Sequence, residues 1–364
     1  KTQAYNFEHI WRQTKEKLYD PGMNGADWER LYTTYKRFLP HINNGYDFAE
    51  MASELLGELN VSHTGCRYHA PSSSLPVAQL GIIPDETYHG EGIRVAEVLS
   101  GGPLDVCKVI KVGSIITSID EMKIEACADY YPMLAGKAGK ATRLSIKGEK
   151  KEIVVRPISW GKQEELLYKR WVRRNEHMVD SLSGGRLAYV HIEAMNAASF
   201  HEFYKNLLSE KNRMRDAVIV DTRHNGGGWL HNDVCIALSG KAYSRFTPRG
   251  KFIGNDPFDR WVKPSCMRVC EDNYSNAHGT PWLYKEMGIG KLIGAPVPGT
   301  MTAVWWENIG QYTFGIPQVG TKDNRGNYLE NQQLEPDIEC YVTPEDMLRG
   351  VDTQIQAAVK EMMK

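Results

Sequence analysis

Three kinds of side chain in this sequence would together support acyl transfer: a hydroxyl, an imidazole and a carboxylate. The candidate hydroxyl is Ser275, in a turn-forming segment before a predicted helix, where exposed nucleophiles are often found. The candidate imidazole is His63, in a loop-like segment, and the candidate carboxylate is Glu330. Taken singly, each is better explained as an ordinary turn, capping or solvated loop residue.

Three consecutive glycines, Gly226, Gly227 and Gly228, follow a short apolar run at 217–220. The run is typical of a strand covered on both faces, and glycines after it can present backbone N–H groups to a ligand. Such amides bind a phosphate or the oxyanion of acyl transfer, and a plain strand-to-helix turn also explains them. The glycine run alone leaves these interpretations open.

The elements that must position these residues begin with helices. The spacing of apolar residues predicts helices over 7–18, 28–38 and 48–59, with Asn6 as the N-cap of the first. Residues 76–158 differ, because they contain short β-type segments divided by Gly, Pro and Asp. We therefore expect a small β-rich module after the helices.

From about residue 161 onward, strands and helices alternate. This alternation predicts an α/β core with helices packed on a sheet. The predicted strands are 186–192, 217–220 and 291–293, and the predicted helices are 199–208, one opened by Thr280-Pro281 and ended by Gly288, and 351–362.

The composition is that of a globular protein without a nucleic-acid or membrane signature. The 364 residues exceed one ordinary core, so two or three domains are expected. A formal net charge of -1 gives no basic surplus for nucleic acid, and no apolar run is long enough to span a membrane. The chain starts at Lys1 with neither Met nor a signal-peptide pattern, so we expect a fragment or a processed form.

The cysteines and histidines show no metal-binding spacing. Cys266 and Cys270 are four residues apart, but without His or Cys partners at zinc spacing we interpret them as two ordinary thiols. The chain also lacks a His-Glu-x-x-His pattern. We therefore predict no metal and no cofactor.

In their order along the chain, the motifs resemble the C-terminal, catalytic half of tricorn protease. This protease belongs to a serine peptidase superfamily together with the C-terminal-processing peptidases, and the resemblance covers nearly the whole chain. The matching motifs are Phe7-x-x-x-Trp11, Ser62-His63, a PDZ-like insertion, Asp221-x-Arg-x-Asn-Gly-Gly-Gly228, Tyr274-Ser-Asn276, and Glu330-Asn331 with Pro336-Asp337.

The resemblance implies a catalytic tetrad. Ser275 would be the nucleophile and His63 the general base. Ser62 would relay between His63 and the carboxylate of Glu330, so that the imidazole keeps the required tautomer and its charged form is stabilised.

The resemblance also implies an oxyanion hole made by the amides of Gly227 and Asn276. Asp is common at the second position in tricorn, but only the backbone N–H of Asn276 is required. Three further residues, Gly226, His224 and His278, are possible pocket residues.

Two other groups compete for the role of base. His278 lies three residues after the candidate nucleophile and would share its face of a helical turn, but we favour His63. C-terminal-processing peptidases use a lysine instead, and the matching stretch here, 294–296, contains none. Lys285 and Lys291 are interpreted as solvent-facing, so a Ser-Lys pair is disfavoured.

The resemblance implies a three-part organisation. Residues 1–75 would be the helical part with Ser62-His63, residues 76–158 a PDZ-like domain, and residues 159–364 the α/β catalytic core. The fold class would be a mixed α/β peptidase core of crotonase/ClpP-like type. The PDZ-like domain would bind an extended peptide at a sheet edge or act as a structural spacer.

The function implied is that of a serine endopeptidase acting on short or unfolded peptides through an acyl-enzyme. The alternatives are a non-catalytic ligand- or peptide-binding protein on the same fold and a crotonase-like enzyme for coenzyme A thioesters. We expect peptide substrates, a homo-oligomer, and propeller-type domains ahead of this region in the full-length protein. We expect a soluble protein of the cytoplasm or the periplasm, without a nucleic-acid partner.

Overall fold

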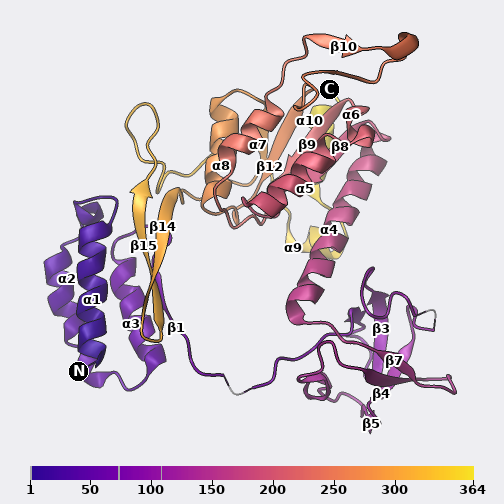
Figure 1. The fold of residues 1–364 in the computed structure, drawn as a ribbon, viewed down its shortest axis with the longest axis horizontal. Coiled ribbons are helices and arrows are strands. Elements are labelled where there is room, and N and C mark those ends of the chain that lie inside the picture. The colour runs from indigo at the N-terminus through magenta and orange to yellow at the C-terminus, as the bar shows by residue number, and fades with distance from the viewer. Residues whose placement is uncertain (1, 73, 108) are drawn as a thin grey trace. The chain divides into compact units, whose positions relative to one another are not determined.

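The computed structural model describes residues 2–72, 74–107 and 109–364. The chain divides into two compact units, the first made of residues up to Pro71 together with Glu176–Lys364, and the second of Ser72–Asn175 (Figure 1). Helix α4 (Trp160–Ser183) contributes residues to both. All residues that the sequence assigns to catalysis lie in the first unit.

Three helices begin the first unit, as the sequence predicts. They are α1 (Thr2–Lys17), α2 (Trp28–Lys36) and α3 (Gly45–Gly57). The prediction of Asn6 as an N-cap is wrong, because α1 already starts at Thr2 and Asn6 lies buried inside the helix. Phe38 lies beyond the end of α2 and is exposed, so the apolar stripe of this helix is shorter than predicted.

A three-stranded antiparallel sheet joins these helices to a distant part of the chain. Strand β1 (Gly65–Tyr68) pairs with β15 (Tyr312–Gly320), which pairs with β14 (Thr302–Ile309). Phe314 and Ile316 of β15 are buried in one core with the three helices. This hairpin was not predicted from the sequence. It holds the loop that follows α3 beside the start of β14.

The second unit is a small antiparallel β structure, which agrees with the β-type segments expected between 76 and 158. Its strands run in the order β2–β3–β4–β6–β7, and β5 pairs with β4. The strands are β2 (Ile82–Pro84), β3 (Ile93–Val98), β4 (Ile115–Ile119), β5 (Met122–Lys123), β6 (Thr142–Ile146) and β7 (Ile153–Val155). Helix α4, which follows β7, was not predicted, because its apolar residues are sparse among charged ones.

A parallel five-stranded sheet forms the centre of the first unit, in the order β16–β13–β12–β9–β8. The predicted strands 186–192, 217–220 and 291–293 are confirmed as β8, β9 and β13, whereas β12 had no predicted range. The strands are β8 (Leu187–His191), β9 (Ala217–Asp221), β12 (Ser265–Val269), β13 (Lys291–Gly294) and β16 (Ile338–Glu339).

Helices cover both faces of this sheet, so the core is of the mixed α/β class (Figure 1). Met267 and Val269 of β12 belong to the apolar core formed with α5, α7 and α8. Arg268, which lies between them, points to the other face and bonds to Asp352 and Gln354 at the start of α10. The helices are α5 (Ala197–Leu207), α6 (Glu210–Arg213), α7 (His231–Leu238), α8 (Asn276–Glu286), α9 (Pro344–Leu348) and α10 (Thr353–Met362).

Helix α8 begins earlier than the sequence indicates. The predicted start at Thr280-Pro281 is wrong, since the helix starts at Asn276 and contains Pro281. Proline has no N–H for the carbonyl four residues earlier. That carbonyl, of Ala277, instead accepts a hydrogen bond of 3.0 Å from the side chain of Asn273. A side-chain donor thus replaces the missing backbone donor.

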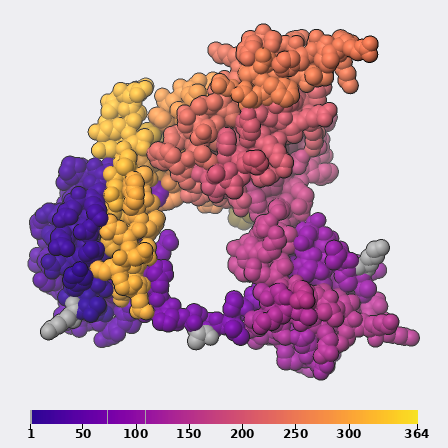
Figure 2. Space-filling model, viewed as in Figure 1, coloured from indigo at the N-terminus to yellow at the C-terminus, as the bar shows by residue number. Residues whose placement is uncertain are grey.

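A two-stranded arm, β10 (Ser244–Phe246) with β11 (Gly254–Asp256), projects from the first unit, and Figure 2 shows it extending from the body of that unit. Phe246, Phe252 and Ile253 on this arm are partly exposed. Within the described residues no helix is long and apolar enough to cross a membrane. The seven cysteines are free thiols, Cys266 and Cys270 among them.

Candidate active site

Ser275 lies in a strained turn between β12 and α8. Its backbone angles, φ 56° and ψ −125°, are uncommon for a residue with a side chain, and such strain occurs at functional turns. Its N–H donates to the hydroxyl of Thr300 at 2.8 Å, while its own hydroxyl makes no hydrogen bond within the described part of the chain. The turn therefore leaves the hydroxyl of Ser275 available to react, because no neighbouring group in the described residues binds it.

The glycine run packs directly against this turn. A Cβ on Gly227 would lie 2.6 Å from Cβ of Ser275 and 2.7 Å from the carbonyl oxygen of Tyr274. Gly227 also has a φ of +97°, which disfavours any other residue. The N–H of Tyr274 donates to the carbonyl of Asn225 at 3.1 Å, so a backbone bond joins the two loops. The two loops meet because they follow the carboxyl ends of β9 and β12, which are neighbouring parallel strands.

His63 is held in place by contacts with residues from three segments of the chain. Nδ1 lies 2.7 Å from the hydroxyl of Ser62 and 3.0 Å from that of Thr302, which opens β14. The backbone N–H of His63 donates to the hydroxyl of Tyr274 at 2.8 Å, and the two rings are 4.7 Å apart between centroids. Thr302 of β14 and Tyr274 of the loop that carries Ser275 thus both help to fix the position of His63.

Glu330 completes a continuous hydrogen-bonded chain with Ser62 and His63. The backbone N–H of Ser62 donates to Oε1 at 2.6 Å, and its hydroxyl donates to Oε2 at 3.0 Å. Because that hydroxyl gives its proton to Glu330, its lone pair accepts from Nδ1 of His63. Nε2 is then the unprotonated nitrogen, as a general base requires.

Burial sets the protonation states along this chain. It lowers the pKa of His63 to about 4, so the imidazole is neutral at neutral pH. Burial raises the pKa of Glu330, while the hydrogen bonds from Ser62 oppose that rise by favouring the carboxylate. A neutral imidazole beside a hydrogen-bonded carboxylate can accept a proton and be stabilised when it does.

A cavity of about 690 Å³ brings Ser275 and His63 to one surface. Its apolar walls come from β14, β15 and the segment after the glycines, and none of the described residues that line it is Asp, Glu, Lys or Arg. Trp305 and Trp306 are half-exposed, so they form a wall of the cavity rather than being buried core residues. The principal apolar lining residues are Trp229, Met301, Val304, Trp305, Trp306 and Val319.

The two backbone N–H groups predicted to bind the oxyanion differ in the hydrogen bonds that they already make. The N–H of Gly227 donates to the side-chain oxygen of Asn225 at 2.8 Å, and Asn225 is anchored in turn to the carbonyl of Ile192. The N–H of Asn276, at the first residue of α8, makes no hydrogen bond within the described residues, and neither do those of Gly226 and Gly228. The assignment of Gly227 stays a prediction, because its amide must be released or shared.

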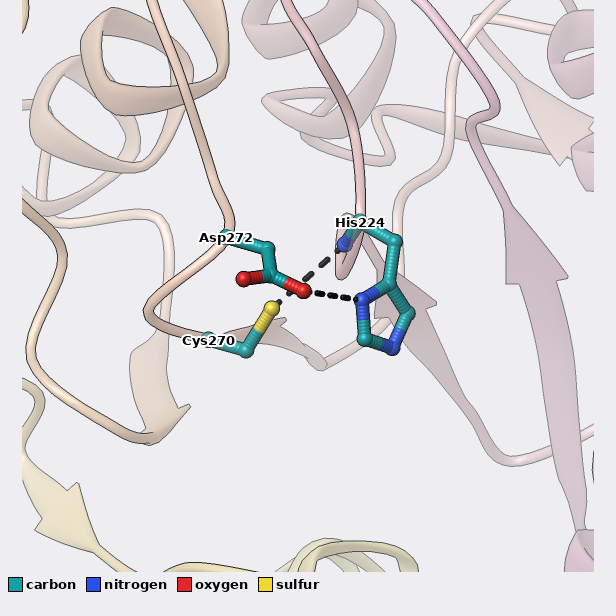
Figure 3. A group of neighbouring side chains, drawn as sticks. All are labelled: His224, Cys270 and Asp272. Atoms are coloured by element: carbon teal, nitrogen blue, oxygen red, sulfur yellow. Dashed lines mark hydrogen bonds and ion pairs between the residues drawn. The ribbon is translucent and has the colours of Figure 1, made fainter.

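The three possible pocket residues have different surroundings. Gly226 lines the cavity. His278 is 1% exposed, does not line the cavity, and has an unpartnered buried Nδ1 among the described residues, while burial lowers its pKa to about 4. His224 does not line the cavity either; its ring is exposed and lies 2.8 Å from a carboxylate oxygen of Asp272 (Figure 3). The structure therefore gives no support to a pocket role for either histidine.

The two lysines considered as alternative bases are exposed and otherwise engaged. Lys285 donates to the carbonyl of Glu335 at 2.9 Å, and Lys291 pairs with Glu361. Sequence reasoning missed Thr300 and Thr302, which hold the nucleophile's amide and the imidazole. Neither threonine stood out by its spacing or its neighbours in the sequence.

Three family models match consecutive parts of this chain. Residues 1–57 match the tricorn protease C1 domain, residues 89–159 the tricorn protease PDZ domain, and residues 186–340 peptidase family S41. The order of these matches along the chain is the order expected from the sequence motifs.

Curated relatives and a solved structure agree with these matches. A putative tricorn-like protease C-terminal subunit of Sulfurisphaera tokodaii is 26% identical, over 98% of this chain and 43% of its own length. The tricorn protease of Thermoplasma acidophilum is 24% identical, over 98% of this chain and 34% of its own length. The chain thus spans less than half the length of these relatives.

The crystal structure of the tricorn protease has the same fold as this chain. The TM-score is 0.89 at 22% sequence identity, and the match covers 100% of this chain and 37% of the other. With regions that match the C1, PDZ and S41 models in this order, the chain is similar to the tricorn proteases over nearly its whole length, and residues 186–340 match peptidase family S41.

Proposed function

We propose that this chain is a serine endopeptidase that hydrolyses short or unfolded peptides through an acyl-enzyme. The observation that supports this most strongly is the hydrogen-bonded chain from Glu330 through Ser62 to His63, which ends at the cavity that Ser275 also lines. Hydroxyl, base and orienting carboxylate come from three distant segments, and a purely structural loop has no need to combine them.

In the first half of the reaction, Oγ of Ser275 attacks the peptide carbonyl carbon and its proton passes to Nε2 of His63. The imidazolium formed is stabilised through Ser62 by the carboxylate of Glu330. The carbon–nitrogen bond then breaks, and His63 gives its proton to the departing amine. In the second half, water loses a proton to His63 and adds to the acyl carbon, and Ser275 leaves with the proton restored.

The oxyanion formed in both halves needs backbone donors at the nucleophile turn. The N–H of Asn276 is suited to this, because it has no bond within the described residues and lies at the N-terminus of α8, where the helix dipole favours negative charge. The second donor would come from the glycine run. Gly227 serves if Asn225 yields its hydrogen bond when a substrate binds.

The cavity supports a preference for peptides with an apolar side chain beside the cleaved bond. Its lining is aromatic and aliphatic, and its described residues offer no charged partner for a basic or acidic side chain. An uncompensated charge would lose its hydration there. Peptides with Phe or Leu beside the scissile bond should therefore be cleaved faster than those with Lys or Asp.

The decisive experiment is labelling with a fluorophosphonate probe together with a Ser275→Ala variant. The wild-type chain should label at Ser275, and the variant should lose both labelling and peptide cleavage while its thermal unfolding stays unchanged. Ser181→Ala, at an exposed serine of α4, is the matched control and should behave as wild type. Labelling elsewhere, or cleavage that survives in Ser275→Ala, would overturn the mechanism.

The alternative of a non-catalytic binding protein predicts a different result. Such a protein would bind a test peptide with measurable affinity but never release product, and it would not react with the probe.

The expected homo-oligomer also stays a prediction. Light scattering on the purified chain tests it, and the exposed apolar side chains of the β10–β11 arm are a surface to vary if self-association is found.

A further inference from the structure

A group of potential metal ligands lies next to, but outside, the proposed catalytic machinery. His224 comes from the loop after β9, and Cys270 and Asp272 come from the loop after β12 (Figure 3). One ligand atom from each, an imidazole nitrogen, a thiol sulfur and a carboxylate oxygen, lie within 4.8 Å of one another. We propose that His224, Cys270 and Asp272 bind a divalent transition-metal ion of the Zn²⁺ class.

The three ligand atoms lie within 4.8 Å of one another, so an ion would draw the sulfur and the other two ligands together by about 1 Å at most. Zn²⁺ bonds of about 2.0–2.3 Å in a tetrahedral arrangement place ligand atoms about 3.3–3.6 Å apart. Nδ1 of His224 and the carboxylate oxygen of Asp272 are now 2.8 Å apart, so they must separate by about half an ångström to admit the ion. Both side chains are more than half exposed, so this adjustment is open to them.

The sulfur is the fixed point of the site. Cys270 is 4% exposed and directly follows β12, whereas the other two ligands lie at the surface. The backbone N–H of His224 lies 3.4 Å from Sγ of Cys270 and donates to it (Figure 3). Backbone donors to a ligating sulfur stabilise its thiolate form, and on metal binding the thiol proton is released to solvent.

The ligand set selects the class of ion. Imidazole nitrogen and thiolate sulfur favour Zn²⁺ and similar transition metals, while Mg²⁺ and Ca²⁺ prefer oxygen ligands only. Three protein ligands and an exposed side leave a fourth position for water. This proposal concerns binding alone and does not depend on the proposed peptidase activity.

The site would join the two loops that carry the proposed active site. His224 is the residue before Asn225, whose carbonyl accepts the N–H of Tyr274, and Asp272 lies three residues before Ser275. A bound ion would add a further link between loops that this backbone bond and the contacts of His224 with Cys270 and Asp272 already connect. Hydrogen exchange of the amides in both loops should slow when Zn²⁺ is added.

Titration of the metal-free chain with Zn²⁺ in the presence of a chromophoric chelator tests the proposal. The wild type should bind one equivalent, and His224→Ala and Cys270→Ser should each weaken binding at least about tenfold. His224→Ala removes an exposed ring, so its fold should survive even if the buried Cys270 proves sensitive. The matched controls are Cys127→Ser and His41→Ala, at exposed residues far from this group in sequence.

Cobalt provides a second readout that identifies the sulfur ligand. The Co²⁺ complex of the wild type should show a thiolate-to-metal charge-transfer band, and Cys270→Ser should lack it. Unchanged Zn²⁺ affinity in both His224→Ala and Cys270→Ser would overturn the proposal. So would loss of the titrated ion in His63→Ala, which would place the metal on the proposed catalytic imidazole instead.

Discussion

Replacing Glu330 by glutamine tests the tetrad most directly, because it removes a charge while nearly preserving shape. Glu330 is 5% exposed and accepts both the N–H and the hydroxyl of Ser62. Glutamine can keep one of these contacts through its carbonyl oxygen. Its NH₂ group can only donate, so one acceptor is lost.

The size of the effect follows from the geometry. Hydrogen bonds of 2.7 Å and 3.0 Å in series put the Glu330 oxygen within about 6 Å of Nδ1 of His63. At an effective dielectric constant of about 20, a carboxylate at this distance stabilises the imidazolium by about 3 kcal/mol. Since that cation exists only during the reaction, kcat should fall about 100-fold.

A reversed proton order would add to this loss. If the NH₂ group introduced by Glu330→Gln donates to the hydroxyl of Ser62, that hydroxyl turns and donates to Nδ1 of His63. The imidazole proton then moves to Nε2, and the nitrogen that should accept from Ser275 is blocked. The estimate of about 100-fold is therefore a lower limit.

The assay is steady-state cleavage of a fluorogenic peptide with an apolar residue beside the scissile bond. We expect kcat to fall while KM changes by less than about threefold, because Glu330 does not line the cavity. Glu335→Gln, at an exposed carboxylate of the same segment, is the control and should leave both constants unchanged. A raised KM with unchanged kcat would refute the reasoning and make Glu330 a binding residue.

Two further predictions concern the glycine run and pH. Gly227→Ala should abolish measurable cleavage and lower the free energy of unfolding by about 1–3 kcal/mol, because the new Cβ would meet Ser275 and Tyr274 at a positive φ. Gly250→Ala is the control, because Gly250 has a φ of +80° but no atom within 4 Å of the added Cβ. Urea unfolding of the two variants therefore separates the steric contact at Gly227 from backbone strain. An equal loss of unfolding free energy in both variants would exclude a destabilising contact with Ser275 and Tyr274. The acid limb of kcat/KM should lie below the ordinary histidine pKa of 6.5, since activity requires neutral His63 and burial lowers its pKa to about 4, a shift that the carboxylate of Glu330 opposes in part. A pH–rate profile whose acid limb lies at the ordinary histidine value of 6.5 would contradict this assignment.

Much of the fold could be predicted from local patterns. The helices α1 to α3 and the strands β8, β9 and β13 were predicted because apolar periodicity is a local property that packing on one face imposes. The start of α8 was predicted wrongly, because Pro281 normally marks a first helical turn. Pro281 is tolerated further inside the helix because the side chain of Asn273 donates to the carbonyl of Ala277, and the spacing of apolar residues does not predict this contact.

The site was only partly accessible from sequence. The resemblance assigned roles to Ser62, His63, Ser275 and Glu330, and the structure places the first two with Glu330 in one hydrogen-bonded chain. Thr302 was missed, because it lies in a hairpin whose pairing with β1 joins segments about 240 residues apart.

The sequence by itself determined the residue types that could act and the strands and helices from which they extend. The tertiary structure alone decided which of them meet. Cys270 was interpreted as an ordinary thiol because no ligand stood at zinc spacing, yet His224 reaches it from another loop. Parallel strands bring their carboxyl ends to one edge whatever the length of chain between them, so potential metal ligands that are distant in sequence become neighbours there.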